Sequence, residues 1–453
     1  MNDDHPPILP SAYAEAPPSV EKADSHFPTP SGRSPWGDGS FWGMVLTQFL
    51  GAFNDNLYKQ AILLLMIAVP IGGKDWNLQS LATFCFSVPF ILFSGYAGYL
   101  SDRYSKWLVI FLSKVAEIVV MGLALALFFV KGEAETDVLL AALFSVVAFL
   151  MGAQSTFFGP GKYGILPELF TDRNLPMVNG VILMTTFLAI ILGTVLAGVM
   201  LEKMPKEPWV IGLACVAIAI VGTATTLPVR RRPGASPQLK FAVDELAIPS
   251  DMRKLLRQDC PLLSAVTVSS VFWMGAAVAM LAVNDLGKLQ LKVGDAKTSY
   301  LVGIISVGIA VGGALGGFLS KGRFRVDFLA IGAWGMTVCL VLLAIPFANQ
   351  DRHLLQFWGS FVVLGLLGGF VGLFAVPLQV FMQMRPPAAL KGRMIATQNL
   401  LNWIGITCAP LVHFLGDQLN HALGWPHCAM FGVTALLVGG IAVLYHPKEV
   451  SLH

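Results

Sequence analysis

Long apolar runs recur along this chain, separated by short polar segments. Each run is mostly apolar over 18 or more residues, about the length that an α-helix needs to cross a bilayer. The pattern predicts twelve membrane-spanning helices joined mostly by short loops. They are expected at 41–70, 77–100, 107–130, 138–159, 176–201, 209–228, 262–284, 298–320, 327–347, 354–382, 393–415 and 427–445.

A longer polar stretch, 229–261, divides these predicted helices into two groups of six. The fold class that we expect is therefore an all-α integral membrane protein, with twelve transmembrane helices in two six-helix bundles at 41–228 and 262–446. The intervening stretch is expected to be a cytoplasmic linker. The end segments, 1–40 and 447–453, are predicted to be cytoplasmic tails, the first of them disordered.

Composition indicates that lipid is the solvent of most of this chain. Of 453 residues, 55% are hydrophobic and 13% charged, and the mean hydropathy is +0.68, whereas soluble domains carry about 25% charged residues. Most of the 30 Lys and Arg residues fall on the side of the predicted membrane that holds both termini, and basic loops stay in the cytoplasm. The net charge of +3 gives no reason to expect a nucleic-acid partner.

A short pattern occurs at corresponding points of the two predicted bundles. Residues 98–106 and 317–323 both read as a small residue, an aromatic residue, Leu-Ser and then a basic turn. This similarity predicts two pseudo-symmetric halves. In the second half, Gly308, Gly312 and Gly316 fall on one helix face, and small residues at that spacing let two helices approach closely in lipid.

The most unusual feature is a charged, amide-rich group in the middle of the first predicted span. Asn54, Asp55 and Asn56 lie near the bilayer centre, where a carboxylate is energetically costly. Lys59 lies one helical turn after Asp55 and Gln48 two turns before it, so Asp55 and Lys59 can pair on one face. That face must contact protein or a water-filled cavity. It forms either a structural ion pair or part of a substrate path or gate.

The third predicted span holds a second pair of opposite charges, Lys114 and Glu117. Lys114 can serve as the counter-charge of Asp55 across a cavity, or it can form a self-contained pair with Glu117. In the first case, a bond that forms in one state and breaks in another makes a gate.

The tight turn after the second span contains Gly98, Asp102, Arg103 and Lys106. An acid beside bases at a helix end can act as a conformational latch between neighbouring helices. Ordinary positive charge on the cytoplasmic side also explains the bases.

Residues 157–169, after the fourth span, hold three glycines and two prolines. We expect the helix to break here and to expose backbone groups, so that Lys162 can meet an anionic group such as a phosphate. A lysine at the membrane surface is the plainer interpretation.

Neutral amides offer further hydrogen bonds, with Asn179 in the first half and Gln379, Gln398 and Asn402 in the second. A cavity that is charged on one side and amide-lined on the other suits an amphipathic, even zwitterionic, solute. The sequence holds no nucleophile with its base, no metal-ligand spacing and no cofactor motif, so we expect neither an enzyme nor a bound metal or cofactor. Three histidines near an outer loop are expected to be solvated: His413, His421 and His427.

Twelve spans in two halves, with the turn at 98–106, resemble the major facilitator superfamily, although Ser105 stands where that family usually has a glycine. Residues 48–56 and 162–169 further resemble two motifs of the bacterial lysophospholipid transporters. Phe272-Trp273 is a weaker agreement with that branch.

This resemblance implies alternating access between two bundles and the flipping of lysophospholipids, chiefly lysophosphatidylethanolamine, to the inner leaflet of the bacterial inner membrane for reacylation. It also implies that Asp55, Lys162 and Lys114 take part in transport. Those transporters carry an arginine in the seventh span, where this chain has no Lys or Arg and Met280 is the nearest equivalent. A gate that depends on the arginine is therefore absent or rebuilt, with Lys59 as the candidate.

The sequence thus predicts a lysophospholipid transporter, active as a monomer, whose partners are the lysophospholipid, the lipid bilayer and a separate acyltransferase. A major facilitator exporter of a drug, sugar or siderophore is the alternative, because the superfamily fold does not fix the substrate. A membrane enzyme or lipid-handling scaffold is a third hypothesis, which the lack of a catalytic constellation disfavours. Coupling to protons, to sodium or to neither stays open.

Overall fold

The computed structural model describes residues 35–133, 137–171, 174–234, 236–239, 248–320, 326–347, 353–387 and 390–445. Most of the predicted N-terminal tail, the whole C-terminal tail and the second basic turn, 321–323, lie outside this part. In chain order the elements are η2 (Pro35–Gly37), α1 (Gly39–Leu65), β1 (Val69–Ile71), β2 (Lys74–Trp76), α2 (Gln79–Arg103), α3 (Lys106–Glu133), α4 (Val138–Leu169), α5 (Leu175–Lys203), α6 (Trp209–Ala224), α7 (Ser250–Gln258), α8 (Cys260–Asp285), the π-helical turn η4 (Leu286–Gln290), α9 (Asp295–Ser320), α10 (Val326–Ala344), α11 (Gln356–Met384), α12 (Lys391–Leu423) and α13 (Ala429–Leu444).

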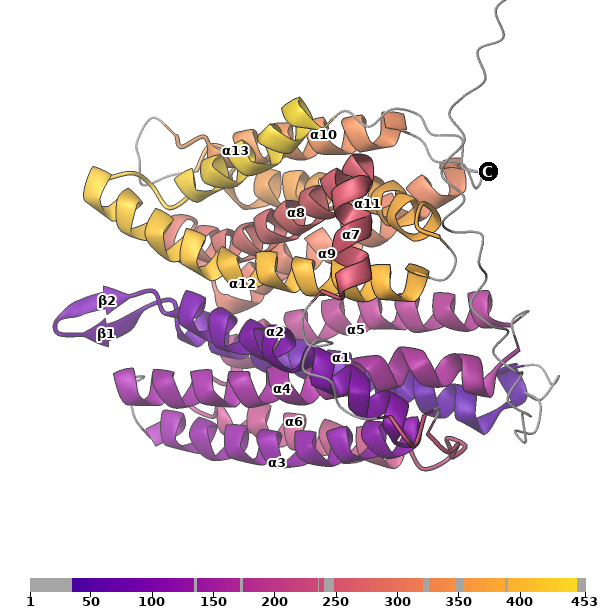
Figure 1. Ribbon diagram of the computed structural model, residues 1–453. Coiled ribbons are helices and arrows are strands. Elements are labelled where there is room, and N and C mark those ends of the chain that lie inside the picture. Colours follow the sequence, from indigo (N-terminus) through magenta and orange to yellow (C-terminus); the bar gives the residue numbers. More distant parts are fainter. Residues whose placement is uncertain are drawn as a thin grey trace, which may run out of the picture.

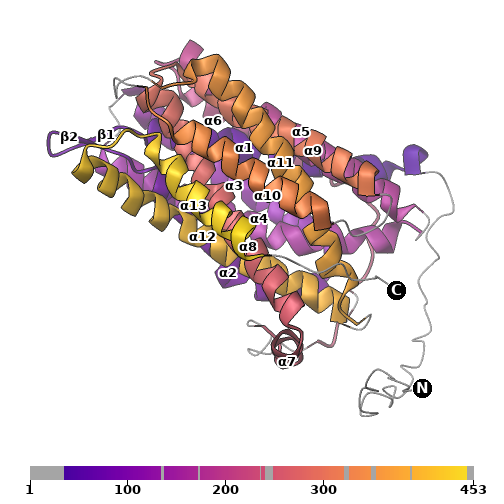
Figure 2. The same cartoon turned by 90° about the horizontal axis from the view of Figure 1, so that it is seen from above.

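Helices α1–α6 form the N-terminal half and α8–α13 the C-terminal half. Figure 1 shows the N-terminal half, indigo to magenta, below the C-terminal half, red to yellow. From above, in Figure 2, helices α10, α11 and α13 of the C-terminal half lie over the rest. Each half has its own apolar core, with Phe128 and Phe144 buried in one and Phe374 and Phe431 in the other.

The helices have the length and composition of a multi-pass membrane protein. Eight of them are long and apolar enough to cross a membrane, namely α2, α3, α4, α5, α8, α9, α10 and α11. Helices α6 and α13 are apolar but only 16 residues long, whereas α1 and α12, of 27 and 33 residues, carry many polar side chains. The predicted all-α membrane fold is confirmed.

The molecule has two distinct ends. The hairpin end carries the antiparallel strands β1 and β2, in which Val69 pairs with Trp76, together with the connection between α12 and α13. The linker end carries α7, which lies within the predicted linker and runs across the long helices (Figure 1). Met252 and Leu256 bury one face of α7 against the C-terminal half.

Helix α4 is continuous through residues 157–169, so the predicted break there is wrong. Pro160 and Pro167 both lie inside the helix. Each proline removes a backbone donor, but spanning helices tolerate this because neighbouring helices hold the chain. A Cβ atom on Gly164 would lie 2.7 Å from Lys106 Cε. Gly161 and Gly164 therefore serve close packing against α3 and not a break.

The glycine stripe of the C-terminal half brings α9 and α11 together, as predicted. A Cβ atom on Gly308 would lie 2.2 Å from the carbonyl oxygen of Gly365. On Gly312 it would lie 1.9 Å from the carbonyl oxygen of Gly369. Backbone meets backbone, so no larger residue fits without moving a helix.

The hydrogen bonds described between the two halves all lie at the hairpin end. The Glu202 carboxylate at the end of α5 accepts one from the backbone N–H of Ala296 on α9, at 2.9 Å. A polar cluster around Asp285 supplies the others. Nearer mid-length, the rings of Phe90 on α2 and Trp403 on α12 stack with centroids 3.6 Å apart. The halves are thus closed on each other at the hairpin end.

Candidate functional site

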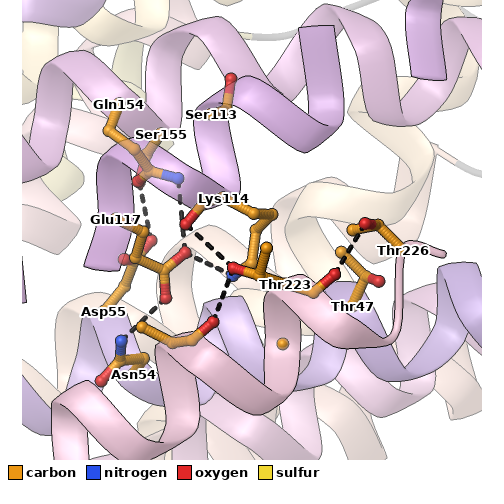
Figure 3. A network of polar contacts seen from close by, with 12 residues as sticks. Thr47, Asn54, Asp55, Ser113, Lys114, Glu117, Gln154, Ser155, Thr223 and Thr226 are labelled. Carbon is orange, nitrogen blue, oxygen red and sulfur yellow. Dashed lines mark hydrogen bonds and ion pairs between the residues drawn. The ribbon is translucent and has the colours of Figure 1, made fainter. Parts of the chain in front are cut away.

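Polar side chains meet at mid-length of α1, α3 and α4 in the N-terminal half (Figure 3). Lys114 and Glu117 form an ion pair on α3, with side chains only 1% and 2% exposed. Lys114 therefore pairs with Glu117, and Asp55 has no ion pair with Lys114 in this structure. We call the group the midspan cluster, and its members are Asn54, Asp55, Lys114, Glu117, Gln154 and Ser155.

Glu117 is the centre of the midspan cluster. Its carboxylate accepts a hydrogen bond from Asn54 Nδ2 at 2.8 Å and a longer one from Gln154 Nε2 at 3.4 Å. Together with Lys114, three side chains from three helices donate to one carboxylate. A buried charge is tolerated only when it is paired and hydrogen-bonded in this way.

Two glycines make room for Lys114. A Cβ atom on Gly51 of α1 would lie 3.1 Å from Lys114 Nζ, and one on Gly222 of α6 would lie 3.2 Å from Lys114 Cε. Thr223 Oγ1 donates to the backbone carbonyl of Lys114 at 3.1 Å. The lysine is thus held between α1 and α6, and a larger residue at either glycine would crowd its side chain.

Asp55 lies half-buried at the edge of the midspan cluster. Its Oδ2 accepts a hydrogen bond from Ser155 Oγ at 2.8 Å, whereas Oδ1 has no partner among the described residues. The predicted ion pair of Asp55 with Lys59 is absent. Instead, the Lys59 ammonium lies 5.5 Å from the ring centroid of Phe86 on α2, where an aromatic face also stabilises a cation.

The other polar residues of α1 point elsewhere. Gln48 is buried and donates from Nε2 to Thr186 Oγ1 of α5 at 3.1 Å. Asn56 donates to the carbonyl of Ala52, one turn earlier in α1, at 2.8 Å. Neither side chain joins the midspan cluster.

Two of the basic residues singled out near the linker end pack inside the N-terminal half. Lys162 is buried in α4, with its Nζ 4.2 Å from the ring centroid of Tyr163. Lys106 forms an ion pair with Glu168 at 2.6 Å, which links the start of α3 to the end of α4.

Among the described residues, the side chains of the rest of the predicted latch make only local contacts. Arg103 donates to the hydroxyl of Tyr99 one turn earlier. The Asp102 side chain is exposed without an ion pair, and its backbone carbonyl accepts from the N–H of Ser236 at 2.9 Å. A Cβ atom on Gly98 would meet nothing within 4 Å.

The predicted amides of the C-terminal half do lie on facing helices. Gln398 Nε2 on α12 donates to Gln379 Oε1 on α11 at 2.5 Å, and Asn402 Oδ1 accepts from Ser269 Oγ on α8 at 2.9 Å. Gln398 Oε1 has no partner among the described residues. Asn179, in contrast, is exposed near the start of α5 and takes no part in this group.

A second polar group, which we call the hairpin-end cluster, was not predicted. The Asp285 carboxylate accepts hydrogen bonds from Asn77 Nδ2 at 2.7 Å and from Gln79 Nε2 at 2.6 Å. Its other oxygen lies 2.8 Å from His413 Nε2, and His413 Nδ1 lies 2.9 Å from Ser80 Oγ. The side chains of Asp285 and His413 are 3% and 1% exposed.

The expectation that all three histidines are solvated is therefore wrong for His413. Helix α12 extends to Leu423 and places His413 between the halves. His421 is 63% exposed, as predicted. Burial lowers the pKa of His427, which lies in the connection after α12, so this side chain stays uncharged at neutral pH.

The sequence indicates some of the site residues that were not predicted more clearly than others. Gln154 and Ser155 interrupt the fourth predicted span, and polar side chains at that depth need polar partners within the protein, as Asp55 does. Asp285 lies one residue beyond the seventh predicted span, at a point where the structure continues as helix into η4. Met280, in the place of the arginine, packs against the apolar core of the C-terminal half.

The arrangement is suited to binding. The buried Lys114–Glu117 pair fixes the wall of the N-terminal half, while Asp55 has a buried carboxylate oxygen without a partner among the described residues and Lys59 carries an ammonium one turn away. The amides of the C-terminal half supply neutral donors and acceptors. A solute that carries both charges can be held between these groups.

Residues 44–410 match the model of the Major Facilitator Superfamily. The chain belongs to this superfamily. The resemblance carried by the turn at 98–106 and by the two-half organisation is thereby confirmed.

Relatives within the superfamily point to one branch. The lysophospholipid transporter LplT of Klebsiella pneumoniae is 26% identical over 413 residues, which are 89% of this chain and 94% of that protein. LplT of Salmonella arizonae is 27% identical over 366 residues, covering 79% of this chain and 83% of the relative. This member of the superfamily is thus similar to lysophospholipid transporters over most of its length.

Solved structures agree on the fold. A POT family transporter in complex with 5-aminolevulinic acid superimposes with a TM-score of 0.67 at 10% identity, covering 91% of this chain and 96% of that one. The nucleoside transporter NupG gives a TM-score of 0.62 at 10% identity, with coverages of 89% and 98%. Their different cargoes illustrate that this fold does not fix the substrate.

Proposed function

We propose that this protein is a lysophospholipid transporter, which moves lysophosphatidylethanolamine-type lipids across the bacterial inner membrane by alternating access. Similarity to LplT over 89% of the chain supports this function. The proposal includes inward flipping by a monomer, both termini in the cytoplasm, and reacylation by a separate acyltransferase. The hairpin end then faces outward, so the structure corresponds to a state closed to the outside.

A groove on the outside of the helix bundle carries the proposal. It has a volume of about 260 Å³ and lies between α5 of one half and α9 and α11 of the other. Apolar and aromatic side chains line it, among them Val195, Ile304 and the 73% exposed Trp358. A water-soluble cargo does not need an apolar path at the border of the halves. A single acyl chain can lie there, out of water, while its headgroup passes between the halves.

The headgroup has candidate partners on α1. Asp55 and Lys59 are both half-buried and are not paired with each other, so their opposite charges remain available one helical turn apart. A phosphoethanolamine headgroup carries one cation and one anion. Asp55 then accepts the ammonium group, and Lys59, with Lys162 farther toward the linker end, attracts the phosphate.

Uptake tests the function directly. Labelled lysophosphatidylethanolamine and its diacyl form are offered to cells that lack their own transporter and express this protein. We expect import of the lysolipid only. Asp55→Asn is expected to lower import by roughly tenfold or more, the loss of one charge-assisted hydrogen bond. Asp75→Asn, on the exposed strand β2, is the matched control and should equal the parent.

If the cells import no lysolipid although the membrane holds normal amounts of the protein, the proposed lipid cargo is wrong. The assignment of the fold is not affected by that result. Export of a drug, sugar or siderophore by the same cells would then favour the alternative cargo. If Asp55→Asn and the parent import the lysolipid equally well, Asp55 does not bind the headgroup.

A further inference from the structure

We propose that Asp285 is a second headgroup site, which closes the hairpin end in one state and binds the primary ammonium group of an arriving lysolipid in the other. The ligand class rests on the proposed function. The closing role rests on the geometry of the hairpin-end cluster alone.

The donors to Asp285 come from both halves. Asn77 and Gln79 belong to the N-terminal half, where they precede and begin α2, and both donate to Oδ1. His413 belongs to the same half as Asp285 and faces Oδ2. When the halves separate at this end, Asn77 and Gln79 leave with α2. The carboxylate then keeps only His413.

Neighbouring side chains reinforce this contact between the halves. Gln60 on α1 donates to Asn284 Oδ1 at 3.0 Å, and Asn284 Nδ2 donates back to Gln79 Oε1 at 3.4 Å. The Ser80 hydroxyl lies 2.9 Å from Nδ1 of His413. Each of these bonds crosses the border between the halves, so the whole cluster opens or closes as one unit.

Opening leaves a carboxylate that needs new donors. Hydrogen bonds to an ionised acceptor are the strong ones, and a buried charge that loses them is destabilised. Nearby, the Lys288 and Asp295 side chains already pair with each other, and Asp417 lies close to His421 and His427. Among the described residues, no Lys or Arg side chain pairs with Asp285, whose ion-pair neighbour is His413.

A primary ammonium group fits this need. It carries a positive charge and three N–H donors, so it can replace both amide donors at once. The quaternary ammonium of phosphocholine has the charge without an N–H, and phosphoglycerol has hydroxyl groups without the charge. A ligand that binds one state better shifts the equilibrium toward that state. The ethanolamine headgroup is therefore expected to favour opening of the hairpin end.

Spin labels measure opening. In a background without the six native cysteines, labels at the exposed positions Lys206 and Leu423 report the separation of the halves at the hairpin end. In lipid nanodiscs, lysophosphatidylethanolamine should lengthen the distance distribution, whereas lysophosphatidylglycerol should not. Asp285→Asn should give longer distances without any lysolipid and no further response.

Uptake separates binding from closing. In Asp285→Asn, the ratio of lysophosphatidylethanolamine import to lysophosphatidylglycerol import should fall by about tenfold, as expected for a lost charge-assisted hydrogen bond. The double variant Asn77→Ala/Gln79→Ala should open the hairpin end yet keep the preference, because the carboxylate remains. Asp285→Glu should fold and also keep it. Asp417→Asn, a buried acid of α12 whose described histidine neighbours lie in the C-terminal half, is the matched control.

The outcomes that overturn the proposal are distinct. A retained headgroup preference in Asp285→Asn removes the ammonium site. Unchanged label distances in Asn77→Ala/Gln79→Ala remove the closing role. If the parent imports no lysolipid while that double variant still lengthens the distances, the proposed function and the ligand class fail and the closing role stands.

Discussion

Replacement of Glu117 by Gln tests whether the buried ion pair organises the N-terminal half. The substitution keeps the size of the side chain and leaves an amide oxygen for Asn54, which donates to Glu117 at 2.8 Å. The second oxygen becomes an NH₂ group that faces the Lys114 ammonium and Gln154 Nε2. Donors then meet donors, and the charge of Lys114 is left without a partner.

The geometry sets the expected magnitude. Both members of the pair are at most 2% exposed, and removal of one partner from such a pair costs about 3–5 kcal/mol. This is a large share of a total stability of about 5–15 kcal/mol. Lys114→Met/Glu117→Leu removes both charges and is expected to cost about 1–3 kcal/mol, mainly for the orphaned donor of Asn54.

The assay is thermal unfolding of the purified parent, Glu117→Gln, Lys114→Met, Glu117→Leu and the double variant Lys114→Met/Glu117→Leu in one detergent. We expect the double variant to be more stable than any single variant, with a coupling energy of at least about 2 kcal/mol. Additive effects, with each single variant costing under about 1 kcal/mol, would refute the view that this pair holds the half together.

Two further substitutions test helix packing. Gly312→Ala places a methyl group 1.9 Å from a backbone oxygen, so we expect little folded protein by size-exclusion chromatography. Gly369→Ala, whose Cβ would meet nothing within 4 Å, should match the parent, and equal damage from both would contradict the packing argument. Lys106→Met breaks the ion pair with Glu168 and should cost about 1 kcal/mol, which lowers the melting temperature of a chain this size by about 1 °C. The charge swap Lys106→Glu/Glu168→Lys should recover part of the loss, and no recovery would mean that packing over Gly164 matters more than charge.

Helix positions were largely predictable, because burial in lipid is a property of each segment by itself. The second span was expected at 77–100 and α2 runs over Gln79–Arg103. The close approach of α9 and α11 was predictable for a related reason. The glycine face of α9 follows from the sequence of that one helix, without knowledge of the helix that packs against it.

Side-chain partners were predictable only in part, since they depend on which helices meet. Helical spacing allowed Asp55 to pair with Lys59, but Phe86 of α2 holds the Lys59 ammonium instead. The break expected at Pro160 does not form, and α3 packs closely against Gly161 and Gly164 of α4 instead. Asp285 lay just outside an apolar run, and only tertiary structure brings Asn77 and Gln79 to it.

The contact between α9 and α11 also affects the groove beside it. Because these helices touch through their backbones at Gly308 and Gly312, they form one rigid wall, whereas Val195 on α5 belongs to the opposite half. If the halves rock as proposed, the groove changes width, and a lipid chain that lies in it favours one width over another. On that proposal, the chain length and saturation of the surrounding lipids are among the variables that set the balance between the two states.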